Sequence, residues 1–429
     1  MPDFPSSPDL SPADLLMAPV PRPGGLALVL SGGGARGAYE AGVARYLLCE
    51  LVPRLPPSAR PRIFCGTSVG AINACALAAH INQPAVGGRL LQQRWESLSL
   101  DAVFRLGWGD LAGLARWIFG SPSAAQTHSL LDAGPLAELV REAIPWRSLH
   151  QNVADGSVAA VSVSATDVET GHTTLFVESL LAANTASTDT VADWIPTRLT
   201  PQHALASAAI PILFPTVRVA GRIYSDGGVR QNTPLSPALR LGADRVLVVS
   251  LRAELAPPLP RPRQELPDQK TFSSPVFLFG KLLDALLLDR VENDLANLRR
   301  VNLALRALGP ALRAAQVPAP VARALEAAGG AGLREVASLL LRPSQDLGRL
   351  AGDVLAQPGV RDRLSGPAGY LLRKLGENAE ETGDPSDLLS YLFFDSDYAH
   401  ELIELGERDA RAREEELASF LDEPCSATG

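Results

Sequence analysis

Two short runs of apolar residues, each followed by a glycine-rich turn and then by helical spacing, open the patterned part of the chain. The first is residues 26–30 (LALVL), followed by SGGGARG and by AYEAGVARYLLCEL over 38–51. The second is residues 62–66 (RIFCG), followed by TSVG and by AINACALAAH over 71–80. Short apolar runs of this kind are typical of strands buried on both faces. A strand–turn–helix unit that occurs twice predicts an α/β domain with a mostly parallel sheet.

The same pattern of short strands and helices continues to residue 251. Run length and turn residues predict strands over 157–168 and 173–179, a short helix over 204–215 stopped by Pro211, a hairpin or a strand with a glycine turn over 217–228, and a strand over 243–251. Residues 85–150 have the spacing of helices and loops.

Four segments differ in composition. Residues 1–24 are rich in Pro and Ser and predict a flexible N-terminal arm. The α/β pattern occupies 25–253 and predicts one α/β domain over that range. Residues 254–275 hold a proline-rich stretch without periodicity, which predicts a linker. Residues 276–429 have helical spacing nearly throughout and predict a helical C-terminal extension with an acidic tail.

Charge is unevenly distributed over the 429 residues, whose formal net charge is −8. It sums to zero over 1–275, to +5 over 276–376 and to −13 over 377–429. Non-specific binding of nucleic acid needs a dense positive face, so we expect no nucleic-acid partner. The positive segment could meet an anionic surface or the acidic tail, and both interpretations stay open.

Cysteine usage and hydropathy indicate the compartment. Four Cys in so long a chain make no disulfide framework, and none has zinc-ligand spacing, so we expect a reducing compartment and no metal. The N-terminus lacks the pattern of a secretory signal, and no run reaches the length of a membrane span. We expect a cytoplasmic protein. The apolar stripe over 277–288 leaves peripheral membrane contact open, although such a stripe more often packs on its own protein.

The first candidate for chemistry is the G-x-S-x-G sequence of Gly66, Ser68 and Gly70. It lies between a predicted strand and a predicted helix, which is the context of a nucleophile elbow. The two glycines permit a tight turn that exposes the Ser68 hydroxyl. The positive end of the following helix favours an anionic intermediate there.

The second candidate is the glycine run Gly32, Gly33, Gly34 and Gly37. It fits the G-x-G-x-x-G pattern of dinucleotide-binding folds, but no acidic residue ends a second strand at the required distance. The alternative is an oxyanion hole, in which successive backbone N–H groups point at one oxygen. We therefore expect no cofactor, and a plain tight turn remains the simplest alternative.

A serine nucleophile needs a base. Six histidines are present: His80, His128, His150, His172, His203 and His400. Only His203 is a serious candidate by position. The other candidate is Asp226, which ends a predicted strand and precedes Gly227 and Gly228. A buried carboxylate can act as a general base, although Asp-Gly-Gly by itself is usually a turn.

Taken in order, these pieces resemble the patatin-like phospholipase family. The likeness covers roughly residues 25–251 and rests on GGGARG, GTSVG and DGGVRQNTPL, with ASAAIPILFP before the last. The helical C-terminal extension is similar to that of bacterial members. The resemblance implies a patatin-like three-layer α/β sandwich with a mostly parallel central sheet.

The resemblance also implies roles for residues. Ser68 is the expected nucleophile and Asp226 its only partner, in a dyad without histidine. Gly32, Gly33, Gly34 and Gly37 are the expected oxyanion loop. Arg36 would hold that loop or meet an anionic head group, the first being favoured. Two small departures are Ser31, where many members have Asp, and Gly228, where many have Ala.

The expected activity is hydrolysis of fatty-acyl esters of lipids, as by a phospholipase A or lysophospholipase. Long acyl chains would need an apolar groove, which we expect from helix 37–50 and segment 85–120. An acyltransferase or thioesterase with the same dyad, a lipid-binding protein without activity, and a nucleotide-binding protein are the alternatives. The sequence predicts no oligomeric state.

Overall fold

The computed structural model describes residues 25–109, 131–180, 192–253, 291–314, 335–382 and 387–422. The predicted arm over 1–24, the predicted linker over 254–275 and the apolar stripe over 277–288 lie outside the described residues.

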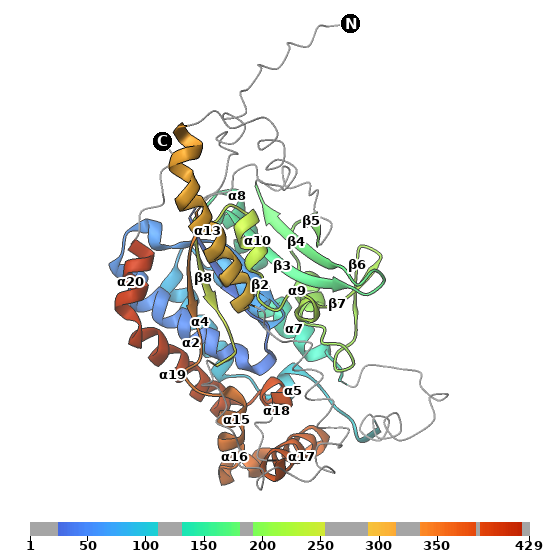
Figure 1. The fold of residues 1–429 in the computed structure, drawn as a ribbon. Coiled ribbons are helices and arrows are strands. Elements are labelled where there is room, and N and C mark those ends of the chain that lie inside the picture. Colours follow the sequence, from blue (N-terminus) through green and yellow to red (C-terminus); the bar gives the residue numbers. More distant parts are fainter. Residues whose placement is uncertain are drawn as a thin grey trace, which may run out of the picture.

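A nine-stranded sheet forms the centre of the molecule (Figure 1). Seven strands follow one another across it in the order β5 (Ala192–Pro196), β4 (Thr173–Ser179), β3 (Ala160–Asp167), β2 (Pro61–Thr67), β1 (Leu26–Leu30), β8 (Arg245–Val249) and β9 (Ala337–Leu341). β2, β1, β8 and β9 run parallel to β3, whereas β4 is antiparallel to it. The predicted, mostly parallel α/β sheet is confirmed.

The remaining elements are helices and short turns. The helices are α2 (Ala38–Tyr46), α3 (Val69–Ala79), α4 (Pro84–Glu96), α5 (Leu100–Val103), α7 (Gly134–Ala143), α8 (Trp146–Ala154), α9 (Pro201–Ser207), α10 (Leu235–Arg240), α13 (Val291–Ala314), α15 (Leu347–Leu355), α16 (Pro358–Arg363), α17 (Gly366–Thr382), α18 (Asp387–Leu392), α19 (Ser396–Ala412) and α20 (Glu414–Asp422). The 3-10 turns are η1 (Gly34–Gly37), η3 (Val52–Arg54), η4 (Pro57–Ala59) and η7 (Gly227–Val229), and the π-turn η2 (Leu47–Leu51) extends α2.

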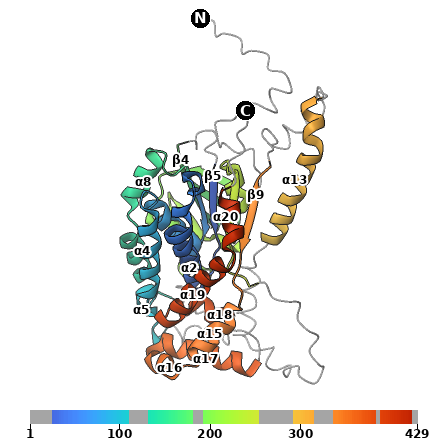
Figure 2. The ribbon, with the colours of Figure 1, turned by 90° about the vertical axis from the view of Figure 1, so that its left-hand side faces the viewer.

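Successive side chains of each strand point to opposite faces of the sheet, so the apolar residues form two cores, one on each face. In β1, Leu26, Leu28 and Leu30 belong to the larger core, and Ala27 and Val29 to the smaller one. The larger core is shared with α2, α3 and α19, and the smaller one with α10 and α13. Successive strand side chains point to opposite faces, so apolar residues at every position require cover on both sides. Figure 2 shows the sheet between the α2–α4–α8 side and α13, which gives three layers.

The spacing after residue 335 suggested helices only, but the structure contains a strand there as well. Residues 337–341 (ASLLL) form β9, which pairs in parallel with β8. A short apolar run fits a buried strand as well as a helix, and here the open edge of β8 decides the outcome. The extension therefore contributes a strand to the central sheet, and its helices α15 to α17 lie together at one end of the molecule (Figure 1).

Helix α19 packs closely along α2. A Cβ atom at Gly42 would lie 2.1 Å from the Ile403 carbonyl oxygen, and one at Gly406 would lie 2.3 Å from the Tyr39 carbonyl oxygen. Glycines in both helices thus permit backbone contact between them. The buried Arg245 of β8 holds the end of α20, because its guanidinium donates to the Phe420 carbonyl at 3.1 Å and to the carbonyl that follows it.

The hairpin β6 (Val217–Val219) and β7 (Arg222–Asp226) completes the sheet and confirms the predicted hairpin. One edge of β3 is paired with β4 over residues 160–166. The other edge pairs first with β2, up to Ser164 opposite Thr67, and then with β7, from Ala165 opposite Asp226. The carboxyl ends of β2 and β7 therefore meet head to head beside β3.

Candidate active site

The predicted elbow is a sharp turn between β2 and α3. Ser68 has φ 55° and ψ −127°, a backbone conformation that costs a non-glycine residue free energy. A Cβ atom at Gly66 would lie 2.2 Å from the Gly70 carbonyl oxygen, and one at Gly70 would lie 2.4 Å from the Leu30 carbonyl oxygen. Both glycines are therefore required for the turn to close.

The Ser68 hydroxyl faces the end of β7. Its Oγ donates to Oδ2 of Asp226 at 2.6 Å, and only 4% of Ser68 is exposed. The backbone N–H of Ser68 donates to the Ser207 hydroxyl at 2.8 Å, and Ser207 in turn donates to the Ser164 carbonyl at 2.5 Å. Helix α9 thus ties the strained turn to β3.

Asp226 is fully buried, and protein groups fix both its backbone and its carboxylate. Its N–H donates to the Ala209 carbonyl at 2.8 Å, and its carbonyl accepts from the Thr166 hydroxyl at 2.9 Å. Oδ1 accepts from the Gly228 N–H at 2.7 Å, which leaves Oδ2 for Ser68. Gly227 lies against β3, where a Cβ atom would be 2.3 Å from the Ser164 carbonyl oxygen.

Burial sets the proton affinity of this carboxylate. It raises the pKa of Asp226 to about 7, although the hydrogen bonds from Ser68 and Gly228 act in the opposite direction. A carboxyl group with a pKa near neutrality can both accept and return a proton at physiological pH, as general acid–base chemistry requires. The pair is therefore arranged for proton transfer from Ser68 to Asp226.

No histidine of the described residues hydrogen-bonds to Ser68 or Asp226. His203 is part of the cap of α9. Its Nδ1 accepts from the backbone N–H of Thr200 and lies 2.8 Å from the Thr200 hydroxyl. Burial lowers the pKa of His203 to about 4. His150 pairs with Glu178 at 2.8 Å.

The other histidines lie apart from the pair as well. His172 is exposed in a turn, His400 pairs with Glu404, and His80 hydrogen-bonds the Ala76 carbonyl. His128 lies outside the described residues.

The glycine run passes directly beside Ser68. A Cβ atom at Gly32 would lie 3.1 Å from Cβ of Ser68 and 2.4 Å from Oδ1 of Asn232. The Gly32 N–H is occupied by the Asn232 carbonyl at 3.1 Å. In the part of the chain that the structure describes, the N–H groups of Gly33 and Gly34 have no protein acceptor. These two groups, with the first N–H groups of α3, are the donors available to an oxyanion.

Protein atoms pack against this loop on several sides. Cβ atoms at Gly33 and Gly34 would lie 2.5 Å from a Leu251 methyl group and 2.3 Å from the Tyr391 carbonyl oxygen. One at Gly37 would lie 2.6 Å from a methyl group of Val69, beside the elbow. These close contacts leave no room for a side chain at Gly33, Gly34 or Gly37.

The segment after the Asp-Gly-Gly turn binds both the glycine run and the end of β2 that precedes Ser68. The sequence did not predict this role. Asn232 brackets Gly32, because its side-chain amide also donates to the Gly32 carbonyl at 3.1 Å. The Thr233 hydroxyl lies 2.6 Å from that of Ser31, and Thr67 donates to the Gln231 carbonyl at 2.9 Å. The only indication in the sequence was the stretch QNTP, which begins five residues beyond Asp226.

The Arg36 side chain contacts the C-terminal extension. Its Nε donates to the Ser390 hydroxyl at 2.8 Å, and its guanidinium lies 4.2 Å from the ring centroid of Tyr391. Only 7% of Arg36 is exposed. The Arg36 side chain is thus held by Ser390 and Tyr391 of the extension.

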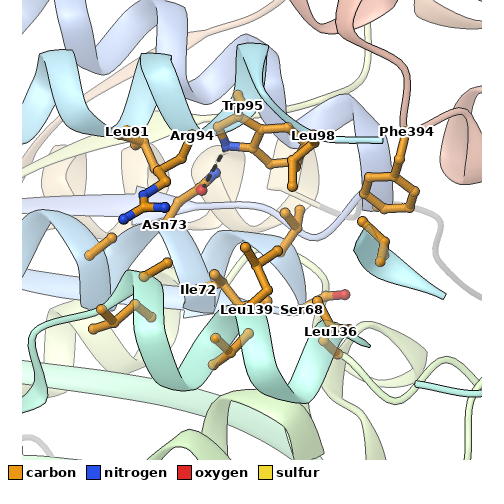
Figure 3. Close-up of a pocket in the computed structure, with 18 of the residues that line it drawn as sticks. Ser68, Ile72, Asn73, Leu91, Arg94, Trp95, Leu98, Leu136, Leu139 and Phe394 are labelled. Atoms are coloured by element: carbon orange, nitrogen blue, oxygen red, sulfur yellow. Dashed lines mark hydrogen bonds between the residues drawn. The ribbon is translucent and has the colours of Figure 1, made fainter. Parts of the chain in front are cut away.

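An apolar pocket of about 290 Å³ extends from Ser68 (Figure 3). Ile72, Ala76 and His80 line it at intervals of four residues and so form one face of α3. Leu91, Trp95 and Leu98 line it from α4 and the turn after it, and Leu136, Leu139 and Val140 from α7. Figure 3 shows Arg94 and Leu91 at the end opposite Ser68 and Phe394.

The pocket differs in part from the predicted groove. Segment 85–109 contributes to it as expected, and residues 110–120 lie outside the described residues. Helix 37–50 contributes no lining residue, because α19 covers it while α3, α4 and α7 form the walls. Asn73 brings the main polar group of the α3 wall, and its Oδ1 accepts from Nε1 of Trp95 at 3.1 Å.

No group of three metal-ligating side chains occurs among the described residues, and no described helix is long and apolar enough to cross a membrane.

Comparisons with known proteins identify a family over about half of the chain. Residues 28–239 match the family model described as patatin-like phospholipase. The crystal structure of VipD from Legionella pneumophila aligns with 92% of this chain and 83% of its own, at 13% identity and a TM-score of 0.29. At that score no property of VipD is transferred to this chain. Curated protein sequences give no significant match.

The raised pKa of Asp226 predicts a pH-dependent gain in stability for Asp226→Asn. Between about pH 4 and 7 the folded protein retains a proton that the unfolded chain has lost, so wild-type stability falls as the pH rises. The variant lacks this titration. Its stability relative to wild type should increase by up to about 4 kcal/mol over that interval and then level off. Thermal melts from pH 4 to 9 measure it, and a constant difference between the two proteins would contradict the assignment.

Proposed function

This chain belongs to the patatin-like phospholipase family through residues 28–239, and we propose that it hydrolyses lipid acyl esters with Ser68 as nucleophile and Asp226 as base. Family membership implies lipid acyl hydrolysis. One observation supports the finer assignment above all others, namely the 2.6 Å hydrogen bond from Ser68 to a buried carboxylate at one end of an apolar pocket.

The first step forms an acyl-enzyme. As Oγ of Ser68 attacks the ester carbonyl carbon, its proton passes to Oδ2 of Asp226, and the carbonyl oxygen takes up the negative charge. When the tetrahedral intermediate collapses, the bond to the alcohol breaks and the leaving oxygen takes the proton from Asp226. The second step repeats these transfers with water as the nucleophile, and it releases the fatty acid and restores Ser68.

The oxyanion is stabilised by backbone dipoles. We assign this role to the N–H groups of Gly33 and Gly34, for which the described residues provide no acceptor, and to the first N–H groups of α3, which follows Ser68 directly. Fixed donors of this type need no reorganisation as charge develops, and one such donor is worth about 10²–10³-fold in rate. Gly34 supports this role with φ +57°, a left-handed conformation that favours glycine.

The pocket indicates a long acyl chain. The lining positions of α3 run from Ser68 to His80, and twelve residues of α-helix span about 18 Å. One leaflet of a bilayer core is about 15 Å thick, which is the room a long acyl chain occupies. With its carbonyl at Ser68, such a chain would lie along Ile72 and Ala76 between α4 and α7.

An acyltransferase or a thioesterase would use the same acyl-enzyme. The three activities differ in the group that arrives at or leaves Ser68, and the described pocket holds the acyl side only. Hydrolysis is preferred because it is the activity that the family implies.

The proposal predicts that Ser68→Ala abolishes hydrolysis of a long-chain phospholipid in mixed micelles and of p-nitrophenyl esters. Asp226→Asn should lower kcat by about 10³-fold or more, because members of one catalytic unit fail together. Ser225→Ala, a buried serine next to Asp226 without a part in the proposed mechanism, is the matched control and should retain activity. Full turnover by a folded Ser68→Ala variant would refute the proposal.

The pocket predicts a change of chain-length preference in Ala76→Phe. Ala76 lies eight residues beyond Ser68, so a large ring there limits the acyl space to roughly 12 Å. We expect kcat/KM for a palmitoyl ester to fall at least about tenfold, while that for a butyryl ester stays within about threefold. An equal loss for both esters would place the acyl chain elsewhere.

A further inference from the structure

We propose that the α18 segment, residues 387–394 of the C-terminal extension, sets the geometry of the oxyanion loop, and that Ser390 and Tyr391 are positioning residues acting through Arg36 and Gly34. The inference rests on the proposed function and deepens it. The α18 segment lies outside the family match over 28–239, so that match says nothing of it.

The first contact is between backbones. A Cβ atom at Gly34 would lie 2.3 Å from the Tyr391 carbonyl oxygen and 3.3 Å from its Cα. The Tyr391 peptide therefore lies directly on the loop, and the loop cannot move toward α18. Asn232 holds Gly32 from the other side through two hydrogen bonds of 3.1 Å. The proposed donors Gly33 and Gly34 follow Gly32 and are bounded by α18.

The second contact is through Arg36, two residues beyond Gly34 in η1. The Ser390 hydroxyl accepts from Nε of Arg36 at 2.8 Å, and the Tyr391 ring lies under the guanidinium at 4.2 Å. Ser390 is fully buried, and Arg36 and Tyr391 are nearly so. Away from water, a charge-assisted hydrogen bond and a cation–π contact hold their geometry firmly. Because the Arg36 N–H donates to the Gly33 carbonyl at 3.2 Å, its position is transmitted to the loop.

The same segment forms part of the pocket wall. Tyr391 and Phe394 line the pocket together with Ser68. The Phe394 ring stacks on Trp95 at 6.3 Å between centroids and meets the edge of Phe104 at 6.4 Å. The α18 segment thus contacts the acyl pocket and the oxyanion loop at once, whereas Ser390 lines no part of the pocket.

The next helix gives α18 a rigid base. Helix α19 begins at Ser396 and packs on α2 through Gly42 and Gly406. The Tyr39 hydroxyl donates to Asp409 at 3.2 Å, which also accepts from a backbone N–H of the extension. Because α2 follows η1 without a break, α19 and α18 fix the loop and the helix that carries it as one unit.

The test compares Ser390→Ala, Arg36→Ala, their double variant and Tyr398→Phe in the full chain. The Tyr398 control removes another buried hydroxyl of the extension, one that donates to the Leu347 carbonyl at 2.9 Å. With a p-nitrophenyl butyrate assay, we expect Ser390→Ala to lower kcat about tenfold with KM within about twofold, since small misplacements of donors are costly. The double variant should lose no more than Arg36→Ala alone, because the two residues act as one unit. Tyr398→Phe should retain wild-type kcat.

A second measurement does not depend on activity. Hydrogen exchange of a peptide covering residues 31–41 should be faster in Ser390→Ala than in wild type, and unchanged in Tyr398→Phe.

The outcomes separate the two claims. If wild type hydrolyses no ester, the proposed function fails. The exchange measurement then still shows whether Ser390 fixes the loop over residues 31–41. If wild type is active and Ser390→Ala matches Tyr398→Phe in kcat and exchange, the inference is overturned. The inference is also overturned if the loss of kcat in the double variant equals the product of the losses in Ser390→Ala and Arg36→Ala.

Discussion

The meeting of two strand ends along one edge of β3 is the constraint on which the site depends. Because β4 occupies the far edge of β3, β2 and β7 share the near one, and the register places Thr67 and Asp226 opposite neighbouring residues. A serine after β2 and a carboxylate ending β7 are then brought together by the pairing of both strands with β3. A one-residue slip of β7 would turn the Asp226 side chain to the other face of the sheet. The register, rather than a flexible loop, holds the 2.6 Å contact.

Two unfavourable features are concentrated at this point. Ser68 adopts a left-handed backbone conformation, and Asp226 has no exposed surface. Each costs stability, and each persists because several groups over-determine it, among them Ser207 at the Ser68 amide and Gly228 at the carboxylate. Strain and burial of this kind are typical of sites in which function is favoured over stability. The same burial moves the pKa of Asp226 into the range where it can exchange protons.

Local motifs indicated the main residues of the site in advance, but not what surrounds them. Gly66 to Gly70 and Asp226 could be identified because their chemistry follows from a short sequence and its strand context. Ser207, Asn232 and Tyr391 could not, because each acts through a contact far along the chain that no spacing reveals. For the same reason β9 was expected to be helical, since only the neighbouring strand makes its apolar run a strand. The mostly parallel sheet and most of its strands were predictable from the sequence, whereas strands β5 and β9 and the contacts between the extension and the glycine run were not.

The reactivity of Ser68 as a function of pH tests most directly whether its hydroxyl depends on the ionised form of the one buried carboxylate of Asp226. The measurement is the rate constant for modification by a fluorophosphonate, followed by intact mass between pH 5 and 9. We expect a rate that rises about tenfold per pH unit at low pH, levels off above about pH 7, and loses this dependence in Asp226→Asn. A rate that is flat across the range, or a profile that Asp226→Asn leaves unchanged, would contradict it.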